Sequence, residues 1–232
     1  MRILIGWDNP DECELMSLYL GVSENELVIC ATPEDFMSQV QEQHDWDIIL
    51  MSIMSPDPQT AFDHFEQIQK KHLDTPIVGA CPTQGTFHVA RFLTAGMRAY
   101  IIRDEGGDFM FLLETTLQSV VDSVRAERER FVAERLREEV ESVRKLQESI
   151  IPTNLISPDR FDVTARYESS QIRVFGGQPV TLAGGDYYDV FMLDDDNLVL
   201  LVGDASGHGM KACMSIMTMH TLVGMIRSNK YL

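Results

Sequence analysis

Basic residues are scarce in this chain. Nineteen Lys and Arg stand against 36 Asp and Glu, which gives a formal net charge of −17. Nucleic acids and anionic membrane surfaces are bound through clustered cations, so this balance argues against both as partners. Such acidity suits a protein that binds divalent cations or basic partners, although it also serves solubility alone.

Long apolar runs and paired cysteines are also missing. No stretch approaches the ~18 apolar residues that a membrane-spanning helix needs. The apolar N-terminus MRILIGW meets the polar segment 8–12 too soon to be a signal peptide. The four cysteines form no C-x-x-C pair, which argues against a zinc site and favours a reduced, cytoplasmic location.

The chain divides into three predicted parts, residues 1–107, 108–151 and 152–232. In the first part, short apolar runs predict five β-strands: Arg2–Gly6, Glu26–Cys30, Asp47–Met51, Pro76–Ala80 and Arg98–Ile102. Helical windows lie between them, near 10–20, 33–43, 60–72 and 84–95. This alternation predicts an α/β domain with a five-stranded parallel sheet, doubly wound with helices on both faces. Functional groups are then expected beyond the carboxyl ends of the strands.

Four segments of the first part, MRILIGWDNPDE, DIILMSIMSP, TPIVGAC and AGMRAYIIRD, together resemble a response-regulator receiver domain. The resemblance covers roughly the first 107 residues. It implies a flavodoxin-like fold and a phosphoryl group accepted from a histidine kinase by an aspartate that ends the third strand. It also implies an acidic pair after the first strand that holds magnesium, a hydroxyl that ends the fourth strand and a lysine that ends the fifth.

The sequence departs from this pattern at nearly every functional position. The acidic pair is Trp7-Asp8, the phospho-acceptor position is Ser52, the hydroxyl position is Cys81 and the lysine position is Arg103. A serine cannot form an acyl phosphate, and one carboxylate with one hydroxyl supplies too little charge for a hard cation. Asp57 is the alternative acceptor. We therefore expect a pseudo-receiver that binds no metal.

The second part is free of glycine and proline from Asp108 to Ile151, which predicts one long helix. Two runs follow heptad spacing with a phase slip between them: Leu117, Val121, Val124, Arg128 and Phe131, then Leu136, Val140, Val143, Gln147 and Ile150. This spacing favours a parallel homodimeric coiled coil. A lone solvated helix and a helix folded back onto the first part are the alternatives.

The third part begins at Pro152, which stops the helix. Strand-like segments cover 161–167, 178–183, 186–193 and 198–203, and a helix is expected over 210–226. A turn at 194–197 makes the last two strands a hairpin that pairs residues whose numbers sum to 391. Asp186 and Asp204 then lie nearly opposite each other, where their carboxylates repel unless a cation or proton lies between them.

The motifs GGDYYDV and GDASGHG, with KLQESIIP before them, resemble metal-dependent protein phosphatases of the PPM family, in the bacterial sporulation and stress-response branch. The family removes phosphate from phosphoserine or phosphothreonine with two Mn²⁺ or Mg²⁺ ions and a bridging water. By this resemblance Asp186 is a metal ligand, Asp204 is the catalytic residue that bridges both ions, and Ala205 lends its carbonyl. His208 is expected to be a loop residue. The implied fold is an α+β domain, a β-sandwich with helices.

Two departures qualify this resemblance. A long insertion at 168–183 predicts an extra hairpin that turns at Gly176-Gly177. The family's remaining aspartates lie on strands well downstream, so we expect this chain to be an inactive fragment of a longer protein.

Three functions of different classes follow from the sequence. The first is a signalling phosphatase that a pseudo-receiver and a coiled coil regulate, with a phosphoprotein substrate such as an anti-sigma-factor antagonist. The second is a non-catalytic dimeric adaptor, and the third a phosphorylatable two-component response regulator. Ser52 argues against the third.

Overall fold

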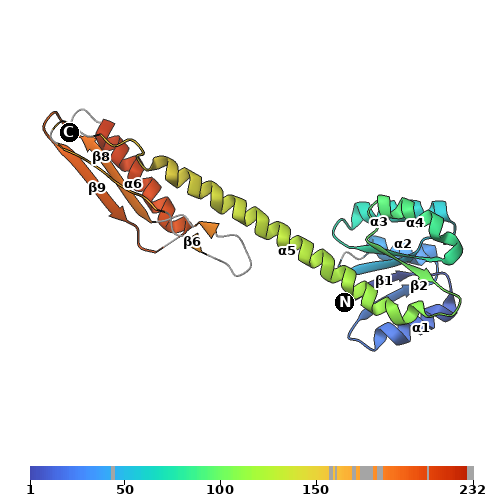
Figure 1. The fold of residues 1–232 in the computed structure, drawn as a ribbon. Coiled ribbons are helices and arrows are strands. Elements are labelled where there is room, and N and C mark those ends of the chain that lie inside the picture. The colour runs from blue at the N-terminus through green and yellow to red at the C-terminus, as the bar shows by residue number, and fades with distance from the viewer. Residues whose placement is uncertain are drawn as a thin grey trace. The chain divides into compact units, whose positions relative to one another are not determined.

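The computed structural model describes residues 1–42, 45–156, 159, 161–168, 171–172, 180–181, 185–207 and 209–228. The chain divides into two compact units, Met1–Glu129 and Arg130–Leu232 (Figure 1). Each unit is described by itself below.

The first unit is built on a sheet of five parallel strands: β1 (Arg2–Gly6), β2 (Glu26–Cys30), β3 (Ile48–Ser52), β4 (Ile77–Pro82) and β5 (Ala99–Arg103). Their order is β2-β1-β3-β4-β5. This is the flavodoxin-like order, in which ligands bind beyond the carboxyl ends of the strands. The predicted five-stranded parallel sheet is therefore confirmed.

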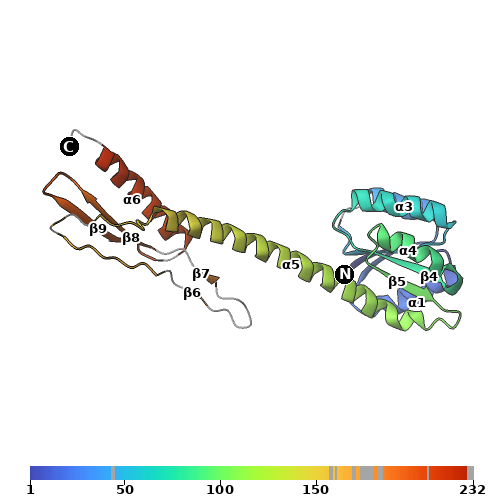
Figure 2. The ribbon, with the colours of Figure 1, turned by 45° about the horizontal axis from the view of Figure 1, so that its top comes forward.

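Helices cover both faces of this sheet. They are α1 (Pro10–Gly21), α2 (Pro33–Glu42), α3 (Pro58–Lys71) and α4 (Thr86–Thr94), with the short 3₁₀ helix η1 (Thr83–Gly85) before α4. Helices α2, α3 and α4 pack on one face, whereas α1 and the start of α5 (Phe109–Ile150) pack on the other (Figures 1 and 2). Asn9 caps α1 by accepting the backbone N–H groups of Asp11 and Glu12, and Pro10 occupies the first turn.

Helix α5 is continuous over 42 residues, as the sequence predicts. Its first turns belong to the core of the first unit, because Phe109, Leu113, Leu117 and Val121 are buried in the same cluster as Ile3 of β1. The compact unit accordingly extends to Glu129, beyond the predicted limit at residue 107.

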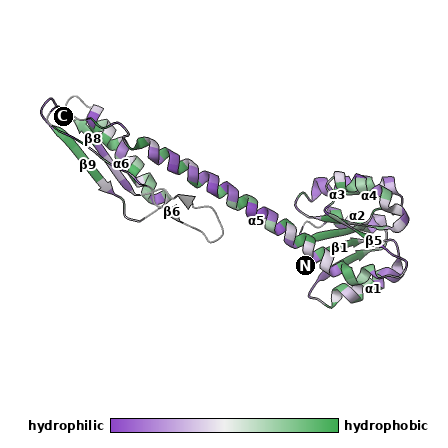
Figure 3. Ribbon diagram, viewed as in Figure 1, coloured by the Kyte–Doolittle hydropathy of each residue, from purple (hydrophilic) through white to green (hydrophobic). Residues whose placement is uncertain are grey.

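The heptad interpretation of the first run is corrected by this packing. Leu117, Val121 and Val124 are buried, so they cannot form an exposed dimer seam, and the folded-back alternative applies to this part of α5. The physical reason is that Leu117 and Val121 pack in one buried cluster with Met16 and Leu20 of α1 on the same face of the sheet. Farther along, the middle of α5 is mostly hydrophilic (Figure 3).

The second unit contains a hairpin of β8 (Asp186–Met192) and β9 (Leu198–Asp204). Its register runs from Met192 opposite Leu198 to Asp186 opposite Asp204. Paired numbers therefore sum to 390, one less than predicted, and the two aspartates face each other directly. Helix α6 (Met210–Ser228) packs on the hairpin, since an added Cβ on Gly203 would meet the Met219 side chain at 2.6 Å.

The predicted strands at 161–167 and 178–183 agree less well with the structure. Residues 161–168 form no strand, because the structure gives this segment no ladder partner; side chains such as Tyr167, which bonds to Gln147, hold it instead. Two short strands, β6 (Gln171–Ile172) and β7 (Val180–Thr181), pair antiparallel, which agrees with an extra hairpin. Its predicted turn at Gly176-Gly177 lies outside the described residues, as does most of the predicted strand 178–183.

None of the helices among the described residues is both long enough and apolar enough to cross a bilayer.

The role of α5 in the first core can be tested with one buried and one exposed side chain of this helix. Val121→Asp places a charge at a site that is 3% exposed, so we expect the free energy of unfolding to fall by roughly 3 kcal/mol or more. Leu112→Asp, on the same helix at 64% exposure and outside any proposed interface, should change it by less than about 0.5 kcal/mol. Urea unfolding followed by tryptophan fluorescence measures this, because Trp7 and Trp46 are both in the first unit. Equal losses for the two variants would contradict the packing.

Candidate functional site

The carboxyl ends of the parallel strands bring the predicted receiver residues to one edge of the sheet. Asp8 follows β1, Ser52 ends β3, Cys81 lies near the end of β4 and Arg103 ends β5. Hydrogen bonds join three of them, because Ser52 and Arg103 both donate to Asp8. The sequence-based placement of these positions is thus supported by their geometry.

Arg103 is the centre of this edge. Its Nη1 donates to Asp8 Oδ1 at 2.6 Å and its Nη2 donates to Glu12 Oε2 at 2.8 Å. The Arg103 side chain is only 13% exposed, and those of Asp8 and Glu12 are 34% and 23% exposed. A fixed guanidinium therefore lies between two partly buried carboxylates, where the attraction is screened less than on an open surface.

The Trp7 ring packs against the Arg103 guanidinium. The Arg103 guanidinium carbon lies 4.5 Å from the centroid of the Trp7 ring, in cation–π geometry. The Trp7 indole Nε1 donates to the same Glu12 oxygen at 2.6 Å. Trp7 is 3% exposed and stacks on Phe109, with ring centroids 6.1 Å apart. Arg103 thus connects β5 to β1 and α1, and through Trp7 to α5.

Glu12 is the residue of this cluster that sequence reasoning missed. The signal that could have found it is its spacing, four residues after Asp8 and in the first turn of a helix that starts at the carboxyl end of β1. A carboxylate there faces the same sheet edge as Asp8.

The side chains at the acceptor and hydroxyl positions are both buried. Ser52 is 4% exposed, and its hydroxyl donates to Asp8 Oδ2 at 3.4 Å. Cys81 is fully buried, and this burial raises the pKa of its thiol. Neither side chain supplies the carboxylate or the free hydroxyl of the receiver pattern.

Asp57, the alternative acceptor, has a structural role. It caps α3 by accepting the backbone N–H groups of Gln59 and Thr60. It also accepts the Thr60 hydroxyl at 2.6 Å, and this bond is the main cause that lowers the pKa of Asp57. The helix cap accounts for an aspartate at this position.

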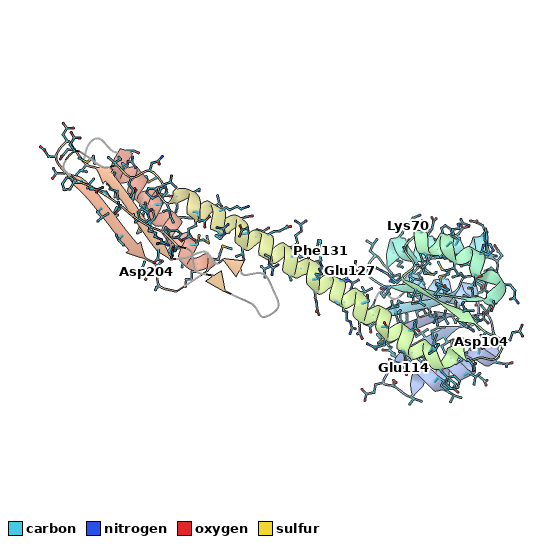
Figure 4. The ribbon with its side chains drawn as sticks, in the orientation of Figure 1. Lys70, Asp104, Glu114, Glu127, Phe131 and Asp204 are labelled. Atoms are coloured by element: carbon cyan, nitrogen blue, oxygen red, sulfur yellow. The ribbon has the colours of Figure 1, made fainter. Side chains whose placement is uncertain are left out.

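The second unit brings the predicted metal ligands together at the open end of the hairpin. Asp186 and Asp204 are both exposed and directly opposite, and Figure 4 shows Asp204 at the end of β9. Ala205 donates its N–H to the Gly185 carbonyl at 2.8 Å. An added Cβ on Gly185 would lie 2.5 Å from the Ala205 oxygen and 3.2 Å from Asp204 Oδ1, so only glycine allows this close approach. His208 lies outside the described residues.

These groups are few for metal binding. Asp186, Asp204 and the Ala205 carbonyl are oxygen donors of the kind that Mn²⁺ and Mg²⁺ prefer. Their type fits the implied ions, but each ion takes about six ligands. In the part of the chain that the structure describes, no group of three or more His, Cys, Asp and Glu side chains is placed to hold a metal.

Beside the hairpin site lies a buried polar contact that the sequence did not reveal. The Tyr187 hydroxyl is 3.0 Å from His220 Nδ1 and 3.2 Å from Asp189 Oδ2. Burial, followed by the charge of Asp189, raises the pKa of Tyr187 to about 12. The neutral phenol therefore ties β8 to α6. Positions 187 and 189 lie on the same face of β8, which is the pattern that could have suggested a contact there.

Comparison with known proteins gives limited matches. No known family model matches the sequence. Protein IcfG of Synechocystis sp. is 30% identical over 76 residues, which are 33% of this chain and 10% of that protein. The chain thus spans about a tenth of the length of the curated relative it matches.

Several solved structures are similar in fold. A CheY-like receiver domain from Methanospirillum hungatei JF-1 is 21% identical, with 54% of this chain and 97% of that chain covered and a TM-score of 0.47. A receiver domain of a Clostridium thermocellum histidine kinase is 17% identical, with 52% and 96% covered and a TM-score of 0.46. NtrX from Brucella abortus is 16% identical, with 66% and 35% covered and a TM-score of 0.48. The strand order, rather than these scores, carries the assignment of the fold.

Removal of the guanidinium tests the ion-pair cluster. Arg103→Ala leaves Asp8 and Glu12 as partly buried carboxylates without their cation. After allowance for solvent screening, we expect the free energy of unfolding to fall by about 1–2 kcal/mol. The matched control is Arg98→Ala, whose ion pair with Glu127 is exposed by 50% and 64%; its loss should stay below about 0.5 kcal/mol. Urea unfolding measures both, and losses of the same small size would count against the cluster.

Proposed function

We propose that this chain belongs to a signalling protein in which a receiver-like domain no longer takes up phosphate and regulates a metal-dependent phosphoserine/threonine phosphatase unit. The observation that carries the first half is the Arg103 guanidinium bound to Asp8 and Glu12. The resemblance of GGDYYDV and GDASGHG to metal-dependent phosphatases carries the second half.

Arg103 and Ser52 argue against phosphoryl transfer for separate reasons. Phosphoryl transfer needs positive charge that can move onto the transferred oxygens, which a metal ion commonly supplies. Here the cation at the sheet edge already bonds to two carboxylates, and no carboxylate occupies the acceptor position. The residue at that position, Ser52, is 4% exposed. The hypothesis of a phosphorylatable response regulator is therefore less well supported than that of a receiver-like domain that takes up no phosphate.

Treatment with acetyl phosphate and Mg²⁺ tests the loss of phosphorylation. Intact-mass measurement should show no hydroxylamine-labile adduct of about 80 daltons, the mass of one phosphoryl group. A functional receiver domain in the same reaction is the positive control. A labile adduct that disappears in Asp57→Ala or Asp8→Ala would contradict the proposal.

On the phosphatase side, Asp186, Asp204 and the Ala205 carbonyl would hold the metal ions, and Asp204 is the proposed catalytic residue. When bound, two Mn²⁺ or Mg²⁺ ions supply an activated water and neutralise the phosphate. Three oxygen donors cannot complete two six-ligand shells, so we place the activity in a longer protein with further aspartates. The substrate would be a phosphoprotein, with an anti-sigma-factor antagonist as the class that the resemblance implies.

Metal-dependent hydrolysis of p-nitrophenyl phosphate tests this half. In a longer protein that contains this segment, Asp204→Asn should abolish the Mn²⁺-dependent rate and Asp186→Asn should reduce it strongly, because each removes a ligand charge. Asp195→Asn, in the hairpin turn, is the matched control and should leave the rate unchanged. The 232-residue chain alone should show little turnover. Fast turnover by this chain that Asp204→Asn removes would contradict the ligand count.

Dimerisation through α5 remains a proposal, now with a different seam. Val132, Leu136 and Leu146 are 64%, 64% and 54% exposed and share one face of the helix. Their spacing, with Val143 between the last two, is that of a heptad seam. A parallel homodimer would cover this stripe whether the protein is a phosphatase or a non-catalytic adaptor.

The free cysteines Cys13, Cys30, Cys81 and Cys213 support a cytoplasmic location.

A further inference from the structure

Helix α1 has an apolar stripe on the side that faces away from the sheet. Met16 and Leu20 fill the core, as an amphipathic helix requires. The outward stripe has the spacing i, i+3, i+4 and i+7. It consists of Leu15, Leu18 and Tyr19 of α1 and of Val22, the residue that follows the helix as its C-cap, and these are 44%, 68%, 40% and 86% exposed. Four apolar side chains on the solvent side of one helix exceed what core packing needs.

Helix α5 adds a fifth side chain to this stripe. The Phe111 ring, 66% exposed, meets the Tyr19 ring edge-on with centroids 5.4 Å apart. We call Leu15, Leu18, Tyr19, Val22 and Phe111 the α1–α5 patch. A contiguous exposed apolar patch of this kind marks an interaction surface more often than single exposed residues do.

The surroundings of the patch carry charge of one sign. Helix α1 contains no Lys or Arg, but it contains Asp11, Glu12 and Glu14. Between Arg103 and Arg125 there is again no Lys or Arg, so the part of α5 beside α1 contributes only acidic groups such as Glu114 and Asp122. Asp11 and Glu14 of α1 lie in the same helix as the apolar stripe. The rim is therefore acidic.

We propose that the α1–α5 patch docks a basic amphipathic helix of another protein. The apolar side chains of the docked helix, at i, i+3, i+4 and i+7, would lie on Leu18, Val22 and Phe111. The Lys or Arg residues that flank them would face the acidic rim. A second copy of this chain fits poorly here, because two acidic rims would meet and repel. An anionic membrane is disfavoured by the same repulsion. This docking depends on neither phosphorylation nor phosphatase activity.

A synthetic helical peptide provides the probe. A fluorescein-labelled peptide with Leu at those four spacings and Lys elsewhere is titrated with the 232-residue chain, and fluorescence anisotropy reports binding. We expect Leu18→Gln/Phe111→Gln to raise the Kd at least tenfold and Glu14→Lys to raise it severalfold. The matched control Leu73→Gln/Phe87→Gln removes two side chains that are 87% and 88% exposed elsewhere, and should change the Kd less than twofold.

A control peptide and a stability measurement complete the experiment. A peptide with Glu in place of Lys should not bind, and thermal unfolding should show the same midpoint for all variants because every changed residue is exposed. The proposal is overturned if the chain does not bind the Lys peptide or binds the Glu peptide equally well. It is also overturned if the control pair weakens binding as much as the patch pair. A dimer that Leu18→Gln/Phe111→Gln dissociates would assign the patch to a second copy instead.

Discussion

The ion pairs of Arg103 with Asp8 and Glu12 hold together the edge of the first unit's sheet at which the strands end. They tie the end of β5 to the end of β1 and the first turn of α1. Because Trp7 lies against the guanidinium and also stacks on Phe109, the start of α5 is held by the same cluster. A charge supplied by the chain itself is present at all times, whereas a bound ion or a phosphoryl group comes and goes. The proposed function follows from this permanence.

Helix α5 has to satisfy two requirements with one sequence. Its first turns complete the cover of the sheet, with Leu113 and Leu117 fully buried, and its later turns leave Val132 and Leu136 exposed. Both requirements produce apolar residues at spacings of three and four, since both rely on one face of a helix.

The apolar runs of the sequence predict the fold of the first unit well. Each of the five apolar runs is a strand, because a parallel sheet covered on both faces needs continuous apolar segments. Ser52, Cys81 and Arg103 also lie at the strand ends that their positions in the motifs predict. Glu12 was missed because no pattern within α1 shows that Arg103, 91 residues later, reaches it.

The later parts of the chain show where local pattern stops being sufficient. The hairpin register was predicted within one residue, since a short turn fixes it. The segment FDVTARY alternates like a strand but forms none, because a strand also needs a partner that local sequence does not name. The run Leu117, Val121 and Val124 fitted a coiled coil and a core equally well, because spacing alone cannot tell which surface covers a stripe.

The central claim is that Arg103 already pairs with the carboxylates of Asp8 and Glu12, which a metal ion at this edge would need. A Mg²⁺ titration of the first unit tests this claim most directly. In the Trp46→Phe variant, Trp7 is the sole tryptophan, and it contacts both Arg103 and Glu12. Its fluorescence then reports the sheet edge and not the hairpin aspartates of the second unit. The account predicts an unchanged spectrum up to about 20 mM Mg²⁺, because the carboxylates are already paired. A saturable change in the Trp7 spectrum over that range would show that a metal displaces the guanidinium, and would contradict the account.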